Sequence, residues 1–212
     1  MSLVIATPAY GNSVTSAYLR SLVRFARMAP IDWDLIMPSR NDSLIQRARN
    51  ACVRLFLDSK YEYLMFVDAD IEFTPEDVAK VWNIDAPIKG GIYPMKVPEK
   101  DVYAAWVDGR LVTELGTEPV EADFLGTGFL MVHRSVFERM QKEWPERTHE
   151  ESGWKDNFAW FDPRVMDTGD GPWYASEDYA FCHDARQLGY RIMADPTVRL
   201  LHHGSFAYGS GR

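Results

Sequence analysis

The chain has little cysteine and no excess of positive charge. Its two cysteines, Cys52 and Cys182, both fall in helix-like segments, so we expect reduced, buried thiols and no disulfide framework. Across 212 residues the formal net charge is −8, whereas a nucleic-acid-binding surface usually needs a basic patch. Nucleic acid is therefore not an expected partner. A nucleotide remains compatible with this charge, because a metal ion can supply local positive charge.

The chain also lacks long apolar runs, internal repeats and low-complexity tracts. No apolar run approaches the roughly 18–20 residues of a membrane span, and no basic start with a long apolar stretch indicates a signal peptide. We therefore expect a cytoplasmic protein without an integral membrane segment. Hydrophobic residues make up 46% of the sequence, which is enough for the core of one medium-sized domain over residues 1–212.

The first part of the chain alternates strand and helix patterns three times. Short apolar runs predict three buried strands, at residues 3–6, 33–37 and 63–67. Helix-like spacing of apolar residues follows each run, at residues 13–28, 42–58 and 75–82. Asp42 is the expected N-cap of the second helix, and Pro75 is expected at the start of the third. This order predicts a parallel sheet with covering helices.

The second part of the chain has a different pattern. Apolar segments broken by glycine predict shorter, mixed strands, at residues 88–93, 103–107, 111–113 and 124–132. Residues 144–174 are rich in Pro, Gly, Asp and Trp and predict a long loop, a kind of segment that is often functional. A helix at 176–188 and strands near 191–194 and 198–202 complete the pattern. We expect one α/β domain, with a Rossmann-like, parallel nucleotide-binding half (1–95) and a mixed-sheet acceptor half (96–212).

The most informative stretch is an apolar strand that runs into two carboxylates, with the sequence Leu-Met-Phe-Val-Asp-Ala-Asp at residues 64–70. Residues i and i+2 of an extended chain point to the same side, so Asp68 and Asp70 can address one ligand. Ligands of open α/β sheets bind beyond the carboxyl ends of the strands. Two carboxylates there predict a Mn²⁺ or Mg²⁺ site shared with substrate phosphates. The alternative is a solvated turn in which aspartate is favoured for local capping.

This stretch resembles the Asp-x-Asp motif of GT-A-fold glycosyltransferases. Four further segments resemble that family in the same order: an Ala-Arg-Asn helix at 48–50, a glycine-containing segment at 126–129 with Arg134 and Phe137, an acidic Ser-Glu-Asp-Tyr segment at 176–179 and a late Leu-His-His-Gly segment at 201–204. The match runs in order from about residue 3 to 204. It is strongest to family 2-like enzymes and to small virus- or phage-encoded glycosyltransferases.

The resemblance implies a nucleotide-diphosphate sugar as the donor, with UDP as the expected nucleotide, and a carbohydrate or other hydroxyl acceptor. It implies that Asp70, Asp68 and His202 bind a divalent cation, with Asp68 mainly holding the ribose or a metal-bound water. It also implies donor contacts from a larger set of residues. These are Thr7, Ala9, Tyr10, Arg40, Arg47, Asn50, Asp68, Ala69, Gly126, Thr127 and Gly128.

Two of these groups have a second interpretation from the residues alone. The loop after the first strand is a candidate to contact the base, with Tyr10 stacking on it, or a plain strand-to-helix turn. The guanidinium groups around the second helix are candidates to bind a diphosphate, and the alternative is that they form the solvent-exposed side of that helix. At about 100° per residue, Arg47 and Asn50 lie on one flank of the apolar face and Arg49 on the other. They therefore need not share one ligand.

Asp178 is the expected general base, which takes the proton from the acceptor hydroxyl in an inverting transfer, and Glu177 is its substitute. Carboxylates in the first turn of a helix are also stabilised by the helix macrodipole alone. His202 and His203 end a strand, so only one of them reaches a given metal. The pattern favours His202, and an imidazole ligand favours Mn²⁺. The alternative is a pair of ordinary loop histidines.

Aromatic residues gather in the predicted long loop. They are candidates for stacking on sugar rings or for the core of the loop itself. The residues in question are Trp154, Trp160, Trp173 and Tyr174.

Other activities stay as alternatives. A retaining glycosyltransferase could carry the same nucleotide half. A haloacid-dehalogenase-like phosphohydrolase also has Asp-x-Asp after an apolar strand, but its pattern has Thr or Val where this chain has Glu72. A sugar nucleotidyltransferase tends to carry a glycine-rich, basic loop after its first strand, unlike the Ala-Tyr-Gly-Asn-Ser at 9–13. A non-catalytic carbohydrate-binding module would need neither the paired carboxylates nor the arginine helix.

Overall fold

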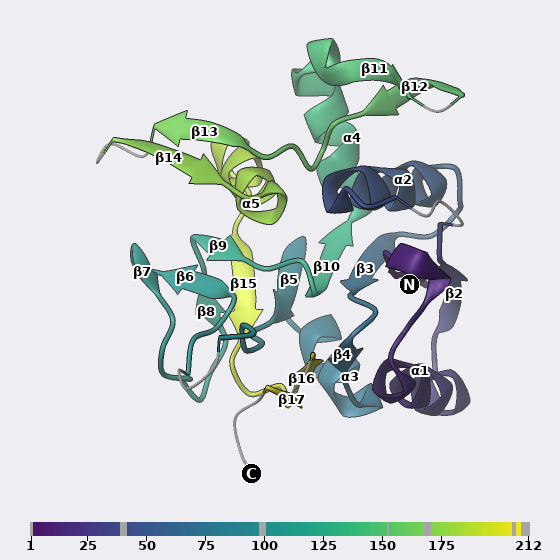
Figure 1. Cartoon of the computed structure of the whole chain (residues 1–212), viewed down its shortest axis with the longest axis vertical. Helices are drawn as coiled ribbons and strands as arrows, with labels where there is room; N and C mark the ends of the chain where they lie inside the picture. The colour runs from purple at the N-terminus through teal and green to yellow at the C-terminus, as the bar shows by residue number, and fades with distance from the viewer. Residues whose placement is uncertain are drawn as a thin grey trace.

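The structure is a computed structural model that describes residues 2–38, 42–97, 101–151, 153–167, 171–204 and 207–208. Its centre is a mixed sheet of seven strands, in the order β2-β1-β3-β10-β5-β15-β8 (Figure 1). These strands are β1 (Ser2–Ala6), β2 (Asp32–Ile36), β3 (Tyr63–Val67), β5 (Ile88–Gly91), β8 (Val120–Glu121), β10 (Phe129–His133) and β15 (Ile192–Asp195).

The first half of the chain has the predicted alternation of strands and helices. β1 pairs in parallel with both β2 and β3, and the connecting helices are α1 (Ser16–Met28) and α2 (Ile45–Leu57). α3 (Pro75–Trp82) follows β3 and begins with a capping box between Thr74 and Asp77, which satisfies two otherwise free N–H groups.

The prediction that Asp42 caps α2 is wrong, because the N-cap residue is Leu44. Asp42 Oδ1 instead accepts a hydrogen bond of 3.0 Å from the Leu44 N–H. Aspartate commonly binds the backbone two residues further on, and this bond favours a turn. The turn delays the start of the helix to Ile45.

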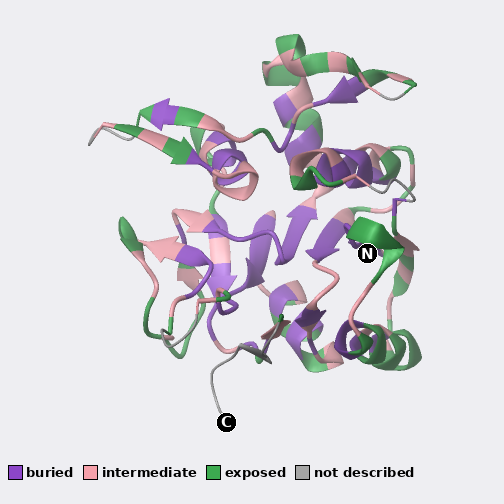
Figure 2. Ribbon diagram, viewed as in Figure 1, coloured by how far each residue is buried: buried purple, intermediate pink, exposed green. Residues whose placement is uncertain are grey.

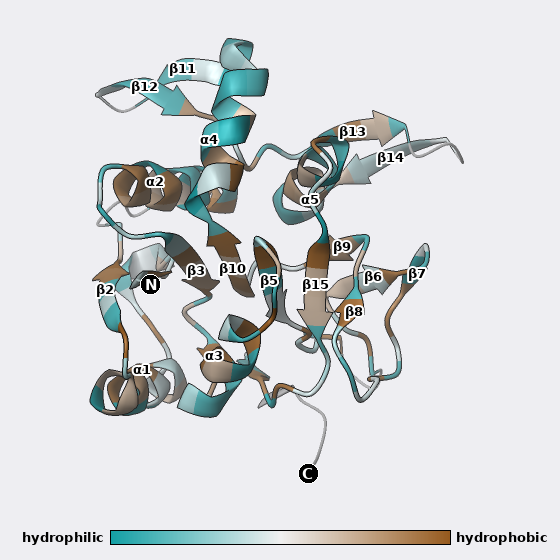
Figure 3. Cartoon of the chain, turned by 180° about the vertical axis from the view of Figure 1, so that it is seen from behind, coloured by the Kyte–Doolittle hydropathy of each residue, from teal (hydrophilic) through white to brown (hydrophobic). Residues whose placement is uncertain are grey.

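The central strands are buried on both faces. Successive side chains of a strand point to opposite sides, so Leu64 and Phe66 of β3 pack into one core layer, whereas Met65 and Val67 pack into the other. The first layer lies under α2, α4 (Arg134–Glu143) and α5 (Glu177–Gln187), and the second lies under α1 and α3 (Figure 1). Figure 2 shows the sheet as the buried centre between the helices. Seen from behind, β10 in the middle of the sheet is strongly hydrophobic (Figure 3).

The second half differs from the sequence prediction in three places. α4 follows β10 directly, although no helix is expected there. The strand predicted at 124–132 is two strands in different sheets, β9 (Phe124–Leu125) and β10. The long loop predicted at 144–174 is wrong: the segment contains the 3₁₀ turn η2 (Pro145–Arg147) and two hairpins. The hairpins are β11 (Thr148–Glu151) with β12 (Trp154–Phe158), and β13 (Arg164–Asp167) with β14 (Pro172–Ala175).

A buried carboxylate explains how the segment after α4 is held. Asp184 of α5 is almost fully buried; its Oδ2 lies 2.5 Å from Arg147 Nη1, and its Oδ1 pairs with Arg164. One side chain thus anchors both η2 and the second hairpin to α5. Such long-range ion pairs leave no local pattern in the sequence, so composition alone predicts a loop.

The remaining elements form two small sheets and one turn. The first sheet joins β7 (Arg110–Leu111), β6 (Ala105–Val107) and β9, and the second joins β17 (Ala207–Tyr208), β16 (Leu201–His203) and β4 (Ile71–Glu72). The 3₁₀ turn η1 (Tyr10–Asn12) follows β1. Among the residues described, no helix has both the length and the apolar character needed to cross a bilayer.

Candidate active site

The two predicted carboxylates lie directly beyond the carboxyl end of β3. β10 runs antiparallel to β3 and pairs Phe129 with Val67, which brings residues 126–128 beside the turn. The Asp68 N–H donates to the Gly128 carbonyl at 3.0 Å, and the Ile71 N–H closes the turn on the Asp68 carbonyl, also at 3.0 Å. The Asp-x-Asp turn is therefore held by the sheet on one side and by its own backbone on the other.

A small sheet brings a histidine to Asp70. β16 pairs with β4 so that His202 lies opposite Ile71, and the His203 N–H donates to the Asp70 carbonyl at 2.8 Å. His202 Nε2 lies 3.4 Å from Asp70 Oδ1, whereas His203 Nε2 lies 2.7 Å from Glu72 Oε2. The two histidines meet different carboxylates, as strand alternation requires, and His202 is the one beside Asp70.

Pro94 fixes the orientation and the tautomer of His202. His202 Nδ1 lies 3.0 Å from the Pro94 carbonyl oxygen. Because a carbonyl oxygen only accepts, Nδ1 carries the proton of this bond. In the neutral ring, Nε2 then presents its lone pair towards Asp70. Metal-ligating histidines have the same arrangement, in which one ring nitrogen donates to a backbone carbonyl and the other has a free lone pair for the metal.

A lysine already supplies positive charge at Asp70. Lys96 Nζ lies 2.5 Å from Asp70 Oδ2. Burial opposes ionisation of Asp70, but the contacts with His202 and Lys96 outweigh it and lower the pKa of Asp70 to about 2. Within the part of the chain described, no three His, Cys, Asp or Glu side chains form a group that could hold a metal ion. Asp70 and His202 offer two ligands, so an ion there would need others from water or substrate.

Arg49 joins the Asp-x-Asp turn to the start of α5. Its side chain is only 4% exposed. Nη1 and Nη2 donate to Asp68 Oδ1 and Oδ2 at 3.0 and 3.2 Å, and Nε donates to Glu177 Oε1 at 3.3 Å. The bidentate geometry is that of a strong charge-assisted pair. Since both oxygens of Asp68 bind the guanidinium, Asp70 is the carboxylate available to a cation.

Asp178 is a half-buried carboxyl with one oxygen open. Its Oδ1 accepts hydrogen bonds from the Ser176 hydroxyl and, at 2.9 Å, from the Tyr179 N–H. Its Oδ2 makes no hydrogen bond within the described residues. Burial, together with the charge of Glu177, raises the pKa of Asp178 to about 6. The helix macrodipole alone would lower this pKa, so burial dominates. Such a carboxyl is suited to accept a proton.

Tyr93 lies under the site, and no pattern in the sequence indicates it. Its hydroxyl accepts a hydrogen bond of 3.1 Å from the Gly128 N–H. A Cβ atom at Gly126 would lie 2.4 Å from the Tyr93 Oη, and one at Gly128 would lie 2.8 Å from it. The two glycines are therefore required by the close approach of this ring. Burial first, and then the charges of Asp68 and Asp178, raise the pKa of Tyr93, which keeps its hydroxyl protonated.

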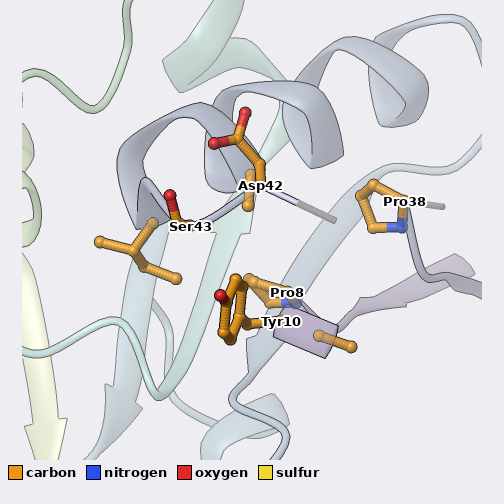
Figure 4. Close-up of a pocket in the computed structure, with 8 residues that line it drawn as sticks. Pro8, Tyr10, Pro38, Asp42 and Ser43 are labelled. Carbon is orange, nitrogen blue, oxygen red and sulfur yellow. The ribbon is translucent and has the colours of Figure 1, made fainter. Parts of the chain in front are cut away.

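Two adjoining clefts share the loop after β1: one lies between this loop and the Asp-x-Asp turn, and the other lies between this loop and the start of α2. The larger, of about 420 Å³, contains five of the predicted residues in its lining: Tyr10, Asp68, Ala69, Asp70 and His202. The smaller, of about 80 Å³, includes Ala9 and again Tyr10. Figure 4 shows the smaller cleft, with Pro8 and Tyr10 opposite Asp42 and Ser43. Tyr10 lines both clefts and is 67% exposed, so its ring is accessible to a ligand.

Two predicted binding residues are buried and engaged elsewhere. Thr7 is fully buried, and its Oγ1 lies 2.5 Å from the Tyr18 hydroxyl. Asn50 is also buried; its amide accepts from the Phe161 N–H at 2.9 Å and donates to the Phe161 carbonyl at 3.2 Å. We therefore leave both side chains out of the proposed binding groups.

Of three further predicted residues, Arg47 and Thr127 line neither cleft, and Arg40 lies outside the described residues. Arg47 Nε lies 3.1 Å from Asp42 Oδ2 and also pairs with Glu151, so Arg47 and Arg49 have separate partners, as their flanks on the helix predict. Thr127 is fully buried, and its hydroxyl has no hydrogen-bond partner in the described residues. Arg40 lies outside the residues that the structure describes.

The aromatic residues of the segment after α4 do not form one cluster. Trp160 is fully buried and packs on Phe137 and Phe158 as part of the core. Tyr174 is 67% exposed. Trp173 instead packs against the ring of Tyr179, the residue that follows Asp178, with the two ring centroids 5.8 Å apart.

Comparison with solved structures identifies the fold of the chain, whereas comparison with family models and curated sequences finds no match. No protein-family model matches the chain, and no curated protein matches its sequence. Solved structures do match. A197 from STIV has a TM-score of 0.61 and 17% identity, over 96% of this chain and 86% of that one. The inositol-1-phosphate CTP transferase from T. maritima has a TM-score of 0.50 and 10% identity, over 95% and 88%. The chain has a GT-A-like fold.

A third match is a glycosyltransferase involved in the glycosylation of the major capsid of PBCV-1, with a TM-score of 0.42 and 11% identity over 73% of this chain and 70% of that one. The seven-stranded mixed sheet with its covering helices confirms the α/β fold class predicted from the sequence. At these identities the matches show the fold alone.

Proposed function

We propose that this chain is a divalent-cation-dependent glycosyltransferase, which moves a sugar from a nucleotide-diphosphate donor, with UDP as the first nucleotide to test, to a hydroxyl acceptor. One observation carries the proposal. Arg49 connects the Asp-x-Asp turn, where Asp70 faces His202, to the start of α5, where Asp178 has a raised pKa. A cation-binding pair and a candidate base thus belong to one connected site.

The donor fits the larger cleft. Its lining brings together Tyr10, whose ring can stack on a base, and the Asp-x-Asp turn with His202. A diphosphate above Asp70 requires positive charge, and Lys96, which pairs with Asp70, supplies part of it. The cleft therefore has an apolar face for the base at one end and a charged end for the diphosphate.

The residues present fit a divalent cation. Asp70 offers a carboxylate oxygen and His202 an oriented imidazole nitrogen, a donor set that suits Mn²⁺. Lys96 shows that a cationic group is accommodated against Asp70. When bound, such an ion would neutralise negative charge on the departing diphosphate.

Asp178 performs the proton transfer in this proposal. The acceptor oxygen forms a bond to the anomeric carbon, and its proton passes to Asp178 Oδ2. The bond from the anomeric carbon to the diphosphate oxygen breaks, and its electron pair leaves with the diphosphate. Glu177 is bound to Arg49, so it positions the guanidinium and is less free to act as the base. A single displacement of this kind inverts the configuration at the anomeric carbon.

The test is nucleotide binding by calorimetry, with UDP and GDP, in Mn²⁺ and then in EDTA. We expect binding that is lost in EDTA. Asp70→Asn should weaken cation-dependent binding more than Asp68→Asn, because both Asp68 oxygens already bind Arg49. Equal affinity in EDTA would contradict the cation role.

The products of slow donor hydrolysis separate this proposal from nucleotidyl transfer. A glycosyltransferase releases nucleoside diphosphate and free sugar. Formation of nucleoside triphosphate and sugar phosphate from the donor and pyrophosphate would instead show a nucleotidyltransferase.

A further inference from the structure

A cavity of about 630 Å³ lies outside the two clefts, between α5, β9, the β6–β7 hairpin and the β13–β14 hairpin. Figure 1 shows these elements together on the side of the sheet away from α1. The side chains of its lining that matter here are Trp106, Asp123, Phe124, Trp173 and Arg186. Nothing in the proposed donor site uses them.

Partly exposed aromatic rings form one wall of the cavity. The ring centroid of Trp173 lies 6.1 Å from that of Trp106 and 5.3 Å from that of Phe124, at interplanar angles of 55° and 59°. All three side chains are only partly buried. Because the rings are tilted and not stacked face to face, they leave aromatic surface open towards the cavity.

Charged groups adjoin this aromatic wall. Arg186 Nη2 lies 3.0 Å from Asp123 Oδ1, and Asp123 Oδ2 accepts a hydrogen bond of 2.7 Å from the Gly109 N–H. Arg186 is 45% exposed, so the guanidinium keeps donors towards solvent. Apolar faces beside planar donors and acceptors match a pyranose ring, which has C–H faces and hydroxyl edges. A phosphate backbone fits poorly, because Asp123 lies in the lining and the protein is acidic overall.

The cavity starts beside the proposed base and extends away from it. Tyr179 directly follows Asp178, packs on Phe124 and Trp173, and has a side-chain hydrogen bond with Trp106. Arg186 comes eight residues after Asp178 on the same helix, which is about 12 Å along the axis at a rise of 1.5 Å per residue. A ligand here would therefore reach beyond the reacting hydroxyl.

We propose that this cavity binds a sugar unit of the acceptor that lies away from the reacting hydroxyl, so the acceptor is an oligosaccharide or longer glycan. The inference rests on the proposed glycosyltransferase function in one respect, namely that the bound glycan is the acceptor of the transfer. The binding site itself does not depend on it, since neither nucleotide nor metal contributes to the cavity.

The experiment measures oligosaccharide binding to the whole chain without nucleotide or metal, by tryptophan fluorescence and calorimetry. The probes are maltohexaose, cellohexaose, chitohexaose, mannohexaose and xylohexaose, with glucose for comparison. We expect at least one hexaose to bind saturably and glucose to bind much more weakly. Trp173→Ala should weaken that binding about three- to tenfold, the range expected for loss of an aromatic contact. Arg186→Met, at an exposed position, should also weaken it.

Trp33→Ala is the matched control, because Trp33 lies in β2 at the opposite edge of the sheet and its ring also packs on a phenylalanine, Phe25, at 5.2 Å; it should leave affinity unchanged. Absence of saturable binding for all five hexaoses would overturn the inference, as would a loss in Trp33→Ala equal to that in Trp173→Ala. Cation-dependent nucleotide binding without hexaose binding would remove this inference and leave the proposed function standing. Hexaose binding without nucleotide binding would support the cavity and contradict the transferase.

Discussion

Asp70 and Asp178 are two carboxyls whose pKa values the fold moves in opposite directions. Burial opposes ionisation of Asp70, but its contacts with His202 and Lys96 outweigh burial and lower its pKa to about 2. At Asp178, burial and the neighbouring Glu177 raise the pKa to about 6. Titratable groups that are separated in this way commonly have separate roles. The first suits a permanent anion that binds a cation, and the second suits a group that gains and loses a proton.

The pH dependence of transfer tests the role of Asp178. A base acts only when ionised, so kcat/KM should fall as the pH drops below about 6, near the pKa of Asp178; an ordinary aspartate would place this limb near pH 4. Transfer assays between pH 4.5 and 8 at constant ionic strength measure it. Asp178→Asn should lower transfer about 10²- to 10⁴-fold and leave nucleotide affinity nearly unchanged.

Glu177→Gln is the control for this assignment. It removes the negative neighbour that helps to raise the pKa of Asp178, so the acidic limb should move to lower pH while transfer persists. Transfer at the wild-type rate in Asp178→Asn would rule out Asp178 as the base, and a limb that stays in place in Glu177→Gln would mean that burial alone raises the pKa of Asp178. Retention of configuration in the product would also argue against it.

In the proposed site, Lys96 and the cation would compete for Asp70, because Lys96 Nζ already pairs with Asp70 Oδ2. A partly exposed ion pair contributes up to about 1 kcal/mol, so Lys96→Met should raise Mn²⁺ affinity about two- to fivefold in the absence of nucleotide. Electron paramagnetic resonance of free Mn²⁺ measures this. Lys60→Met, whose ammonium pairs with the exposed Asp32, is the control and should have no effect. A lower Mn²⁺ affinity in Lys96→Met would mean that the lysine does not occupy the place of the ion.

At the scale of elements, Arg134 ties the start of α4 to the end of α2. Its guanidinium donates to the carbonyls of Phe56, Leu57, Ser59 and Tyr61, at distances from 2.7 to 3.0 Å. The last carbonyls of a helix have no partner within it, so this side chain supplies charged donors to the end of α2, where the Phe56 carbonyl also accepts from the Ser59 N–H at 2.9 Å. Arg134 therefore acts in the fold, although the resemblance to glycosyltransferases places it with the donor segment.

Loss of this contact should destabilise the protein. We expect Arg134→Ala to lower the free energy of unfolding by about 2–4 kcal/mol, because several carbonyls lose a charged donor. Arg139→Ala on the same helix is the comparison: Arg139 is 52% exposed and pairs only with Glu143 at i+4, so its loss should cost about 0.5 kcal/mol or less. Urea unfolding monitored by circular dichroism measures both. Equal losses would contradict the role of Arg134.

Elements with a strong local pattern could be predicted, and elements defined by distant contacts could not. β1, β2 and β3 are apolar runs followed by helix-like spacing, so their order and parallel pairing follow from the sequence. α4 is a ten-residue helix with only Val136, Phe137 and Met140 buried, which is too short for its period to stand out beside β10. η2 and the second hairpin after α4 are anchored by Asp184, through contacts between segments far apart in the sequence.

The candidate site shows the same division. Asp68 and Asp70 follow an apolar strand, so their place at a sheet edge could be predicted. His202 is favoured over His203 by pattern, and the structure places it beside Asp70. Lys96 and Tyr93 could not be predicted, because they reach the site through the turn of the chain after β5. The hydrogen bonds between the Asn50 side chain and the Phe161 backbone could not be predicted either, since the two residues are 111 positions apart in the sequence.

At the scale of the whole molecule, Arg49 connects the two halves of the chain. It lies on α2 in the first half, binds Asp68 at the end of β3, and reaches Glu177 on α5 in the second half. Two carboxylates, 23% and 14% exposed, face one guanidinium that is 4% exposed. The sheet already joins the two halves through its backbone, and Arg49, Asp68 and Glu177 join them through charge.

Arg49→Met should therefore destabilise the whole molecule. Removing one partner leaves two half-buried carboxylates uncompensated, at a cost of about 3–5 kcal/mol near pH 7. Urea unfolding monitored by circular dichroism measures it. Arg54→Met on the same helix, whose partner Asp58 is 58% exposed, should show only a small loss.

A further variant separates lost charge pairing from lost packing. If uncompensated charge causes the loss, then Arg49→Met combined with Asp68→Asn and Glu177→Gln should recover stability relative to Arg49→Met alone, since neutral amides replace both carboxylates. If the loss came only from the shape of the buried side chain, the combined variant would be at least as unstable as Arg49→Met. That result would assign Arg49 to packing on the Phe66 ring, 5.7 Å from its guanidinium carbon, and would remove the electrostatic link between the two halves.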